Sequence, residues 1–254
     1  MTENLPIIKN VYIDTNTYRN LTHITDVNLR NVKWYNNSMS YAFEGCYNLQ
    51  SVSNINENVT NMYETFYDCD NLVNAPEIPN SVTDMSYTFY GCHNLVNAPI
   101  IPNSVTNMRY TFGTCHNLVN APVIPNSVTD MSDTFYGCIN LVNTPVIPNS
   151  VINMSYTFGA CRNLVNAPVI PNSVTDMAWT FRECHILVGD IYVYSESIIN
   201  ATNCFFGTTL TKNVYIPFTY ENGVNTSTYN SFINAGYDEN GTSCGVYLKD
   251  IKQL

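Results

Sequence analysis

The chain has 254 residues, a formal net charge of −10, and a composition that is 45% hydrophobic but only 12% charged. This apolar and aromatic content excludes an intrinsically disordered chain and is typical of one sizeable domain or two small ones. Ten basic residues against twenty acidic ones, with no basic cluster, argue against nucleic acid as a partner.

Residues 1–35 are predicted to form an N-terminal cap with a degenerate first rung. The triplet at 11–13 alternates in the manner of a strand. Leu29 and Val32 precede Val52 and Ile55 by the same step that governs the rest of the chain. A degenerate copy of the repeat is therefore predicted before residue 36.

The same N-terminal region carries no export signal. It lacks a basic segment followed by an apolar run, and no later apolar run approaches the roughly 18 residues of a membrane span. We therefore expect no signal peptide, no anchor and no membrane insertion. As written, the chain is expected to be virion-associated or cytoplasmic, and to reach a cell surface only by leaderless export.

Residues 36–217 repeat with a period of 23 residues. Four residue types keep this step through seven copies, in the series that start at Met39, Phe43, Cys46 and Leu49. Such a unit cannot bury its apolar edge alone, so successive units must stack and share one core. We predict a solenoid of eight to nine rungs, capped at both ends and on the order of 40 Å long at the parallel-strand spacing.

Each unit is predicted to contain three local structures. In the copy that starts at Val82, the segment 82–85 reads as a short parallel strand with Val82 and Met85 inward. The Phe89–Cys92 spacing predicts a single helical turn. The stretch up to Pro102 is expected to be extended, with asparagines such as Asn94 bonding backbone groups at the corners.

Residues 218–254 are predicted to form a C-terminal cap. Continuing the 23-residue step places Cys204 in the Phe series, Gly207 in the Cys series and Leu210 in the Leu series. A helix is expected at 227–235 with Thr226 and Gly236 as its caps, and a short strand at 245–249.

No catalytic residue, metal ligand set or cofactor is predicted. Stacked thiols with parallel Cβ vectors are expected to stay reduced, and no CxxC pair offers a metal site. A bridge between Cys204 and Cys244 is left open. His93 and His116 lie on adjacent rungs and suit a solvent-facing column better than an adventitious metal site, and neither has a nucleophile at a fixed spacing.

Two variable stripes are predicted to face outward. The first, here called the aromatic stripe, is a candidate binding surface made of Tyr87, Tyr90, Tyr110, Tyr136, Tyr156 and Trp179. The second, the apolar stripe, is a candidate interface made of Ile100, Val123, Val146 and Val169. The alternating FYGC and FGTC or FGAC motifs indicate copying of 46-residue blocks.

The Phe-x2-Cys-x2-Leu spacing, the IPNSVT corner and VTxMxxxF at a 23-residue step resemble the BspA-like, Treponema-type leucine-rich repeats over roughly residues 36–217. The resemblance implies a leucine-rich-repeat solenoid whose relatives are surface proteins that bind host proteins or other cells. It does not imply an enzyme. We expect the chain to lack the leader, wall-sorting motif and membrane anchor of the usual members.

We therefore expect a non-enzymatic recognition or adhesion module that binds a host or cell-surface protein or glycan, as a bacterial adhesin or a phage receptor-binding component. The alternatives are a virion or surface-layer protein that associates with itself through an outer stripe, and an intracellular protein-binding scaffold.

Overall fold

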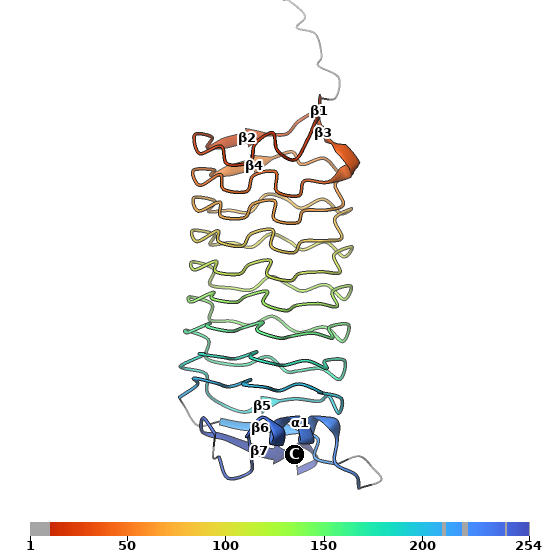
Figure 1. Ribbon diagram of the computed structural model, residues 1–254, viewed down its shortest axis with the longest axis vertical. Helices are drawn as coiled ribbons and strands as arrows, with labels where there is room; N and C mark the ends of the chain where they lie inside the picture. Colours follow the sequence, from red (N-terminus) through yellow and green to blue (C-terminus); the bar gives the residue numbers. More distant parts are fainter. Residues whose placement is uncertain (1–10, 210–211, 220–222, 242, 254) are drawn as a thin grey trace, which may run out of the picture.

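The computed structural model is a straight stack of rungs that runs from the N-terminal strands at one end to the C-terminal helix and strands at the other (Figure 1). It describes residues 11–253 except 210, 211, 220–222 and 242. Residues 1–10 of the predicted N-terminal cap, and Leu210 with its predicted place in the Leu series, lie outside the described residues.

Regular secondary structure is concentrated at the two ends. The strands of the N-terminal end are β1 (Val11–Ile13), β2 (Asp26–Asn28), β3 (Val32–Trp34) and β4 (Ser51–Ser53). Those of the C-terminal end are β5 (Ile191–Tyr192), β6 (Lys212–Ile216) and β7 (Val246–Asp250). The helices are η1 (Tyr35–Asn37), α1 (Ser227–Asn234) and η2 (Ile251–Gln253).

Between the ends, single parallel bridges replace longer strands. One ladder of bridges runs unbroken from Ser38 to Asn200, with one Asn or Asp from each rung between them. The side-chain oxygen of that residue also accepts the backbone N–H two positions later, as Asp84 does from Ser86 at 2.9 Å. This turn closes the ladder after one residue, because it draws the chain out of the extended conformation.

The prediction of a single helical turn is wrong. From Met85 to Leu95 the chain makes overlapping turns, in which Thr88, Tyr90, Cys92 and Leu95 each donate to the carbonyl three residues back. A left-handed residue, Tyr87 with φ 55°, interrupts the run. Such a residue cannot continue a right-handed helix.

The core consists of columns that repeat in every rung. The Val, Met, Phe, Cys, Leu and Ile series are buried as predicted, and the Ala series is partly buried. Successive phenyl rings stack with centroids 5.4–5.8 Å apart and planes within 11° from Phe43 to Phe205. The columns give each rung two neighbours and one continuous core.

A buried threonine column, which the sequence reading missed, ties the rungs together. Thr88 Oγ1 lies 2.8 Å from the carbonyl oxygens of both Met62 in the previous rung and Met85 in its own. The column thiols do similar work, since Cys92 Sγ donates to the carbonyl of Phe66 at 3.1 Å. The polar side-chain atoms inside this core therefore bond to backbone carbonyl groups that are not paired with a neighbouring strand.

The asparagine column differs from its prediction. Apart from Asn48, which donates to the carbonyl of Thr22, its members bond one another across rungs, as Asn117 Nδ2 does to Asn94 Oδ1 at 3.2 Å. Similar bonds join Asn71 to Asn48 and Asn163 to Asn140. The result is a side-chain ladder parallel to the stack.

The register of the last repeat also corrects the prediction. Phe205, not Cys204, continues the phenyl stack at 5.6 Å from Phe181, and Thr208, not Gly207, makes the turn bond that the column cysteines make. The bridge from Asp176 to Asn200 confirms a 24-residue step. The extra residue lies in the corner, where Ser-Glu-Ser at 195–197 replaces Asn-Ser.

Aromatic side chains close the phenyl column at both ends. Tyr18 stacks on Phe43 at 5.0 Å, and Tyr237 meets Phe205 edge-on at 5.5 Å while its hydroxyl accepts from the Phe205 N–H. The predicted tail elements are present as α1 and β7. The Thr226 side chain caps α1, whose C-cap is Ala235, with left-handed Gly236 following.

Candidate functional site

The aromatic stripe forms two clusters on one edge of the stack. In the first, the rings of Tyr87 and Tyr110 stack at 4.5 Å, and Tyr90 lies 5.9 Å from both. In the second, Tyr156 stacks on Trp179 at 5.6 Å and meets Tyr136 edge-on at 6.3 Å. The structure thus brings all six predicted residues into two neighbouring groups.

The clusters include two rings that the sequence reading missed. Tyr63 lies 5.9 Å from Tyr87, and Phe206 lies 6.0 Å from Trp179. Phe206 was missed because the 24-residue step moves it into the column of Arg182. Tyr63 was missed because its own column holds mainly serine, so no repeated aromatic marked it.

The aromatic stripe has two columns: an inner one that includes Tyr87 and Tyr110, and an outer one three residues later in each rung, at positions such as Tyr90 and Tyr136. The backbone of the inner column is left-handed in every rung. The residues with φ between 50° and 63° are Tyr41, Glu64, Tyr87, Tyr110, Asp133, Tyr156, Trp179 and Asn203. Glycine, asparagine and aspartate adopt this conformation at the least cost, whereas a bulky side chain is an outlier there. Five of these eight positions nevertheless carry an aromatic residue.

From Tyr90 onward, the outer column alternates large and small residues. The ring of Tyr90 covers Gly113 in the next rung, and the ring of Tyr136 covers Gly159. A Cβ at Gly113 would lie 2.6 Å from Tyr90 Cδ2, and one at Gly159 would lie 3.1 Å from Tyr136 Cδ2, so glycine fits beneath both rings. The two-rung rhythm of the motifs therefore has a packing function in addition to its origin by duplication.

Cationic groups lie on the aromatic faces. The guanidinium of Arg109 is 5.5 Å from the centre of the Tyr110 ring, and that of Arg182 is 5.3 Å from the centre of the Trp179 ring. Both distances suit a cation–π interaction. The stripe thus presents tyrosine, tryptophan and arginine together.

Asp133 separates the two clusters. Only 6% of its surface is exposed, and burial raises the pKa of its carboxyl to about 6, against the effects of a hydrogen bond with Tyr110 and the charge of Arg109. The same burial, with Asp133 nearby, raises the pKa of the Tyr110 hydroxyl. The stripe therefore contains one carboxyl that titrates near neutrality.

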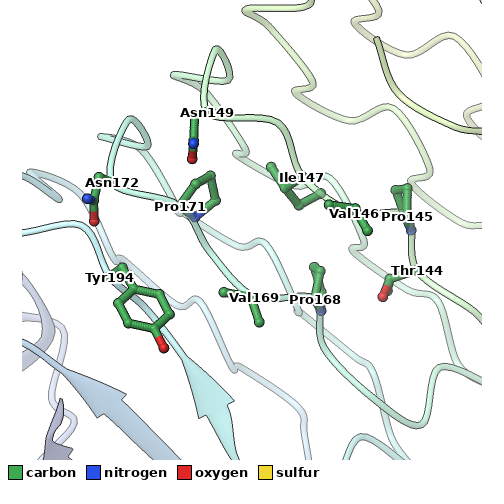
Figure 2. Close-up of a pocket in the computed structure, with 10 residues that line it drawn as sticks. All are labelled: Thr144, Pro145, Val146, Ile147, Asn149, Pro168, Val169, Pro171, Asn172 and Tyr194. Carbon is green, nitrogen blue, oxygen red and sulfur yellow. The ribbon is translucent and has the colours of Figure 1, made fainter. Parts of the chain in front are cut away.

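The apolar stripe lies at the proline corners, away from the aromatic clusters. Its side chains stand out from the surface, with exposed fractions of 90% for Ile100 and 87% for both Val123 and Val146. Val169 is 52% exposed and faces Tyr194 across a depression that Figure 2 shows. All four predicted residues are on the surface.

The histidine column holds a pair rather than a metal centre. The rings of His93 and His116 lie 4.5 Å apart, and His93 Nδ1 contacts Asp70 Oδ1. Burial and the neighbouring His93 lower the pKa of His116. Within the described part of the chain, no three His, Cys, Asp or Glu side chains converge as a metal would require.

The seven thiols of the Cys series are buried in the core, where the repeat places them. All nine cysteines are among the described residues and none is paired; Cys204 is buried in the core and Cys244 is half-buried in the tail. Burial raises the pKa of the column thiols, as at Cys92 and Cys115. Of the helices in the described ranges, none is long and apolar enough to span a membrane.

Two family models match the sequence. Residues 3–119 match the BspA type leucine rich repeat region in six copies. Residues 79–166 and 106–216 match a family described as a Mycoplasma protein of unknown function. No curated protein matches the chain.

Solved structures with the same architecture come from several bacteria. A leucine-rich repeat protein of Treponema pallidum is 27% identical, with 65% of this chain and 72% of that chain covered and a TM-score of 0.50. One from Bacteroides ovatus is 18% identical with a TM-score of 0.56, and the match covers 94% of this chain but only 64% of the other. The second likeness concerns the fold alone.

Proposed function

Since the chain belongs to the BspA-type leucine-rich repeat proteins, we propose that it is a non-enzymatic recognition module that binds a protein through its aromatic stripe. Proteins of this type are generally surface or protein-binding proteins. The finer part of the proposal is an adhesin-like role, in which the partner is a protein on a host or other cell surface.

The observation that carries the proposal is the left-handed backbone under the aromatic rings. Tyr87, Tyr110, Tyr156 and Trp179 all have φ between 54° and 59°. A non-glycine residue there costs on the order of 1 kcal/mol or more, and the fold accepts Asp133 and Asn203 at equivalent positions. Bulky aromatics kept at a conformational cost point to a use outside the folded chain.

The composition of the stripe favours a protein over a glycan. Tyrosine, tryptophan and arginine dominate the energetics of protein interfaces. A sugar needs a free ring face on which to stack, whereas the ring faces of Tyr87 and Tyr110 cover each other and Arg109 lies over Tyr110. Stacked rings with hydroxyl and guanidinium groups beside them suit a polypeptide surface.

The experiment compares two triple variants of the chain. Tyr87→Asn, Tyr110→Asn and Tyr156→Asn together remove three stripe rings while keeping a residue that tolerates left-handed φ. The control replaces three exposed tyrosines outside the stripe, Tyr12, Tyr35 and Tyr47, by asparagine. Each protein is applied to arrays of immobilised host extracellular proteins and of glycans, and to whole host cells.

We expect the parent and the control to bind the same protein spots and the stripe variant to lose them, with thermal unfolding showing that both variants are folded. Binding by the stripe variant equal to that of the parent would place the contact surface elsewhere. Binding confined to glycan spots and lost in the stripe variant would replace the protein partner by a carbohydrate.

A further inference from the structure

The apolar stripe is a row of isolated, protruding aliphatic side chains. Ile100, Val123, Val146 and Val169 follow one another at successive rungs, each between the two prolines of a Pro-x-Ile-Pro corner. An exposed apolar row of this length is unusual on a protein that has no partner for it. It lies apart from the aromatic stripe and does not depend on the function proposed for that stripe.

Shallow depressions separate these side chains at the same step. Between Val146 and Val169, the depression has a volume of about 420 Å³ and is walled by Pro168 and Pro171, with Tyr194 at its far end (Figure 2). Equivalent depressions lie between Val123 and Val146 and on both sides of Ile100. The stripe is therefore a regular series of ridges and hollows.

The period of the series selects its occupant. Rungs joined by parallel bridges repeat at about 4.8 Å. Along one face of an extended peptide, the side chains repeat at about 6.8 Å. If one of them occupies a hollow, the next one therefore lies against a ridge. Along one face of a helix the side chains follow at rises of about 4.5 and 6 Å, because three or four residues separate them, so they do not form an even row. A second copy of the chain carries the same ridges and hollows at the same period, so it fits without drift.

The charge pattern agrees with this occupant. Two chains of charge −10 repel each other overall. The stripe from Ile100 to Val169 has no charged residue, and exposed asparagines such as Asn126 and Asn149 lie beside it. The nearest charge in the column is Glu77, one rung before Ile100. An antiparallel arrangement keeps the two copies of Glu77 at opposite ends.

We infer that the apolar stripe is a self-association surface, on which a second copy of the chain lies antiparallel, with its aliphatic ridges in the hollows of the first. A two-fold axis lies between Val123 and Val146, a quarter of a rung from one of them, because an axis midway between them would set ridge against ridge. Each copy then uses the same residues, as an isologous dimer requires. The aromatic stripes of both copies remain outside this contact.

The test is sedimentation velocity of the full chain over a range of concentrations. We expect the parent to shift from monomer to dimer as the concentration rises, and the Val123→Asp and Val146→Asp double variant to remain monomeric. The matched control, Ile152→Asp with Ile199→Asp, places the same two charges at exposed isoleucines outside the stripe and should dimerise as the parent does.

Three outcomes would overturn the inference: a parent that stays monomeric at all concentrations, a stripe variant that dimerises like the parent, or equal loss of the dimer in the control. A monomeric parent whose Val variant loses a spot on the protein array would assign the stripe to a different protein. The tyrosine triple variant should still dimerise, which separates this inference from the proposed function.

Discussion

The ring of Tyr90 lies directly over the backbone of Gly113 in the following rung. A methyl group on Gly113 would come within 2.6 Å of Tyr90 Cδ2 and 2.9 Å of Cε2. Tyr136 and Gly159 repeat this relationship two rungs later, with a closest approach of 3.1 Å. The outer column of the aromatic stripe is thus packed in pairs of rungs.

Gly113→Ala is expected to lower the free energy of unfolding by about 1 to 3 kcal/mol, because the added methyl displaces the Tyr90 ring, which stacks on Tyr67 at 4.9 Å. The φ of Gly113 is not in the left-handed region, so backbone strain does not contribute. Chemical denaturation of Gly113→Ala, Tyr90→Ala and the double variant measures the coupling. In the Tyr90→Ala background the glycine substitution should cost little; an equal cost in both backgrounds would contradict the ring contact.

Phe112→Ala should lower the free energy of unfolding by about 3 to 5 kcal/mol, because it removes one ring from a continuous stack and opens a cavity shared with both neighbouring rungs. Phe206→Ala, at a half-exposed ring, serves as the control and should cost about 1 kcal/mol or less. Similar melting temperatures for the two variants would show that the phenyl column does not carry the core.

Asp133→Asn should stabilise the protein at pH 7 and not at pH 4. The carboxyl has a folded pKa of about 6, above the value near 3.9 of an unfolded aspartate. Between these values the unfolded state loses its proton first, so the parent loses stability as pH rises from about 4 to 6. The expected gain for the variant at pH 7 is on the order of 2 kcal/mol.

Denaturation of both proteins at pH 4, 5, 6 and 7 provides the check. Asparagine also tolerates the left-handed φ of Asp133, so the backbone is not disturbed. Asp84→Asn is the matched control, since asparagine fills the same column in the adjacent rungs. A gain at Asp133 that is the same at every pH would exclude the carboxyl titration as its cause.

Thiol labelling should separate the core column from the tail. Burial raises the pKa of Cys92 and Cys115, so these thiols are protonated and shielded at pH 8. A thiol reagent should modify about one cysteine of the folded protein, Cys244, and all nine after denaturation. Recovery of only one free thiol in denaturant would mean four disulfides and would refute the reduced column.

The sequence pattern predicted the core because, in a stack of repeats, the same positions of each 23-residue unit are buried. Once Phe43 and Phe66 share a step, every later ring follows, and only the inserted residue in the Ser-Glu-Ser corner breaks the count. That insertion lies in a corner that contains no residue of the Met, Phe, Cys or Leu series, so these series did not reveal it. Thr88 was missed because a hydroxyl that bonds two buried carbonyls looks, in sequence, like a surface residue.

The local turn could not be predicted for a different reason. The Phe89–Cys92 spacing fits one turn of a helix, and nothing in the residue type of Tyr87 indicates left-handed φ. That conformation is imposed by the bonds that each rung makes to the next, such as the one from the Tyr87 N–H to the carbonyl of Arg109. The stripe residues were found by their variability, but their grouping into two clusters around Asp133 needed the geometry.

The phenyl column also determines how the molecule would respond to mechanical load. Each ring from Phe43 to Phe205 has one ring on either side. When the rung at one end unfolds, the next rung therefore becomes the end rung and loses the same stacking contact. A chain pulled by its two ends would extend in steps of 23 residues, each releasing about 70 Å of chain. Such a body yields rung by rung under tension, while the rungs still stacked keep their shape.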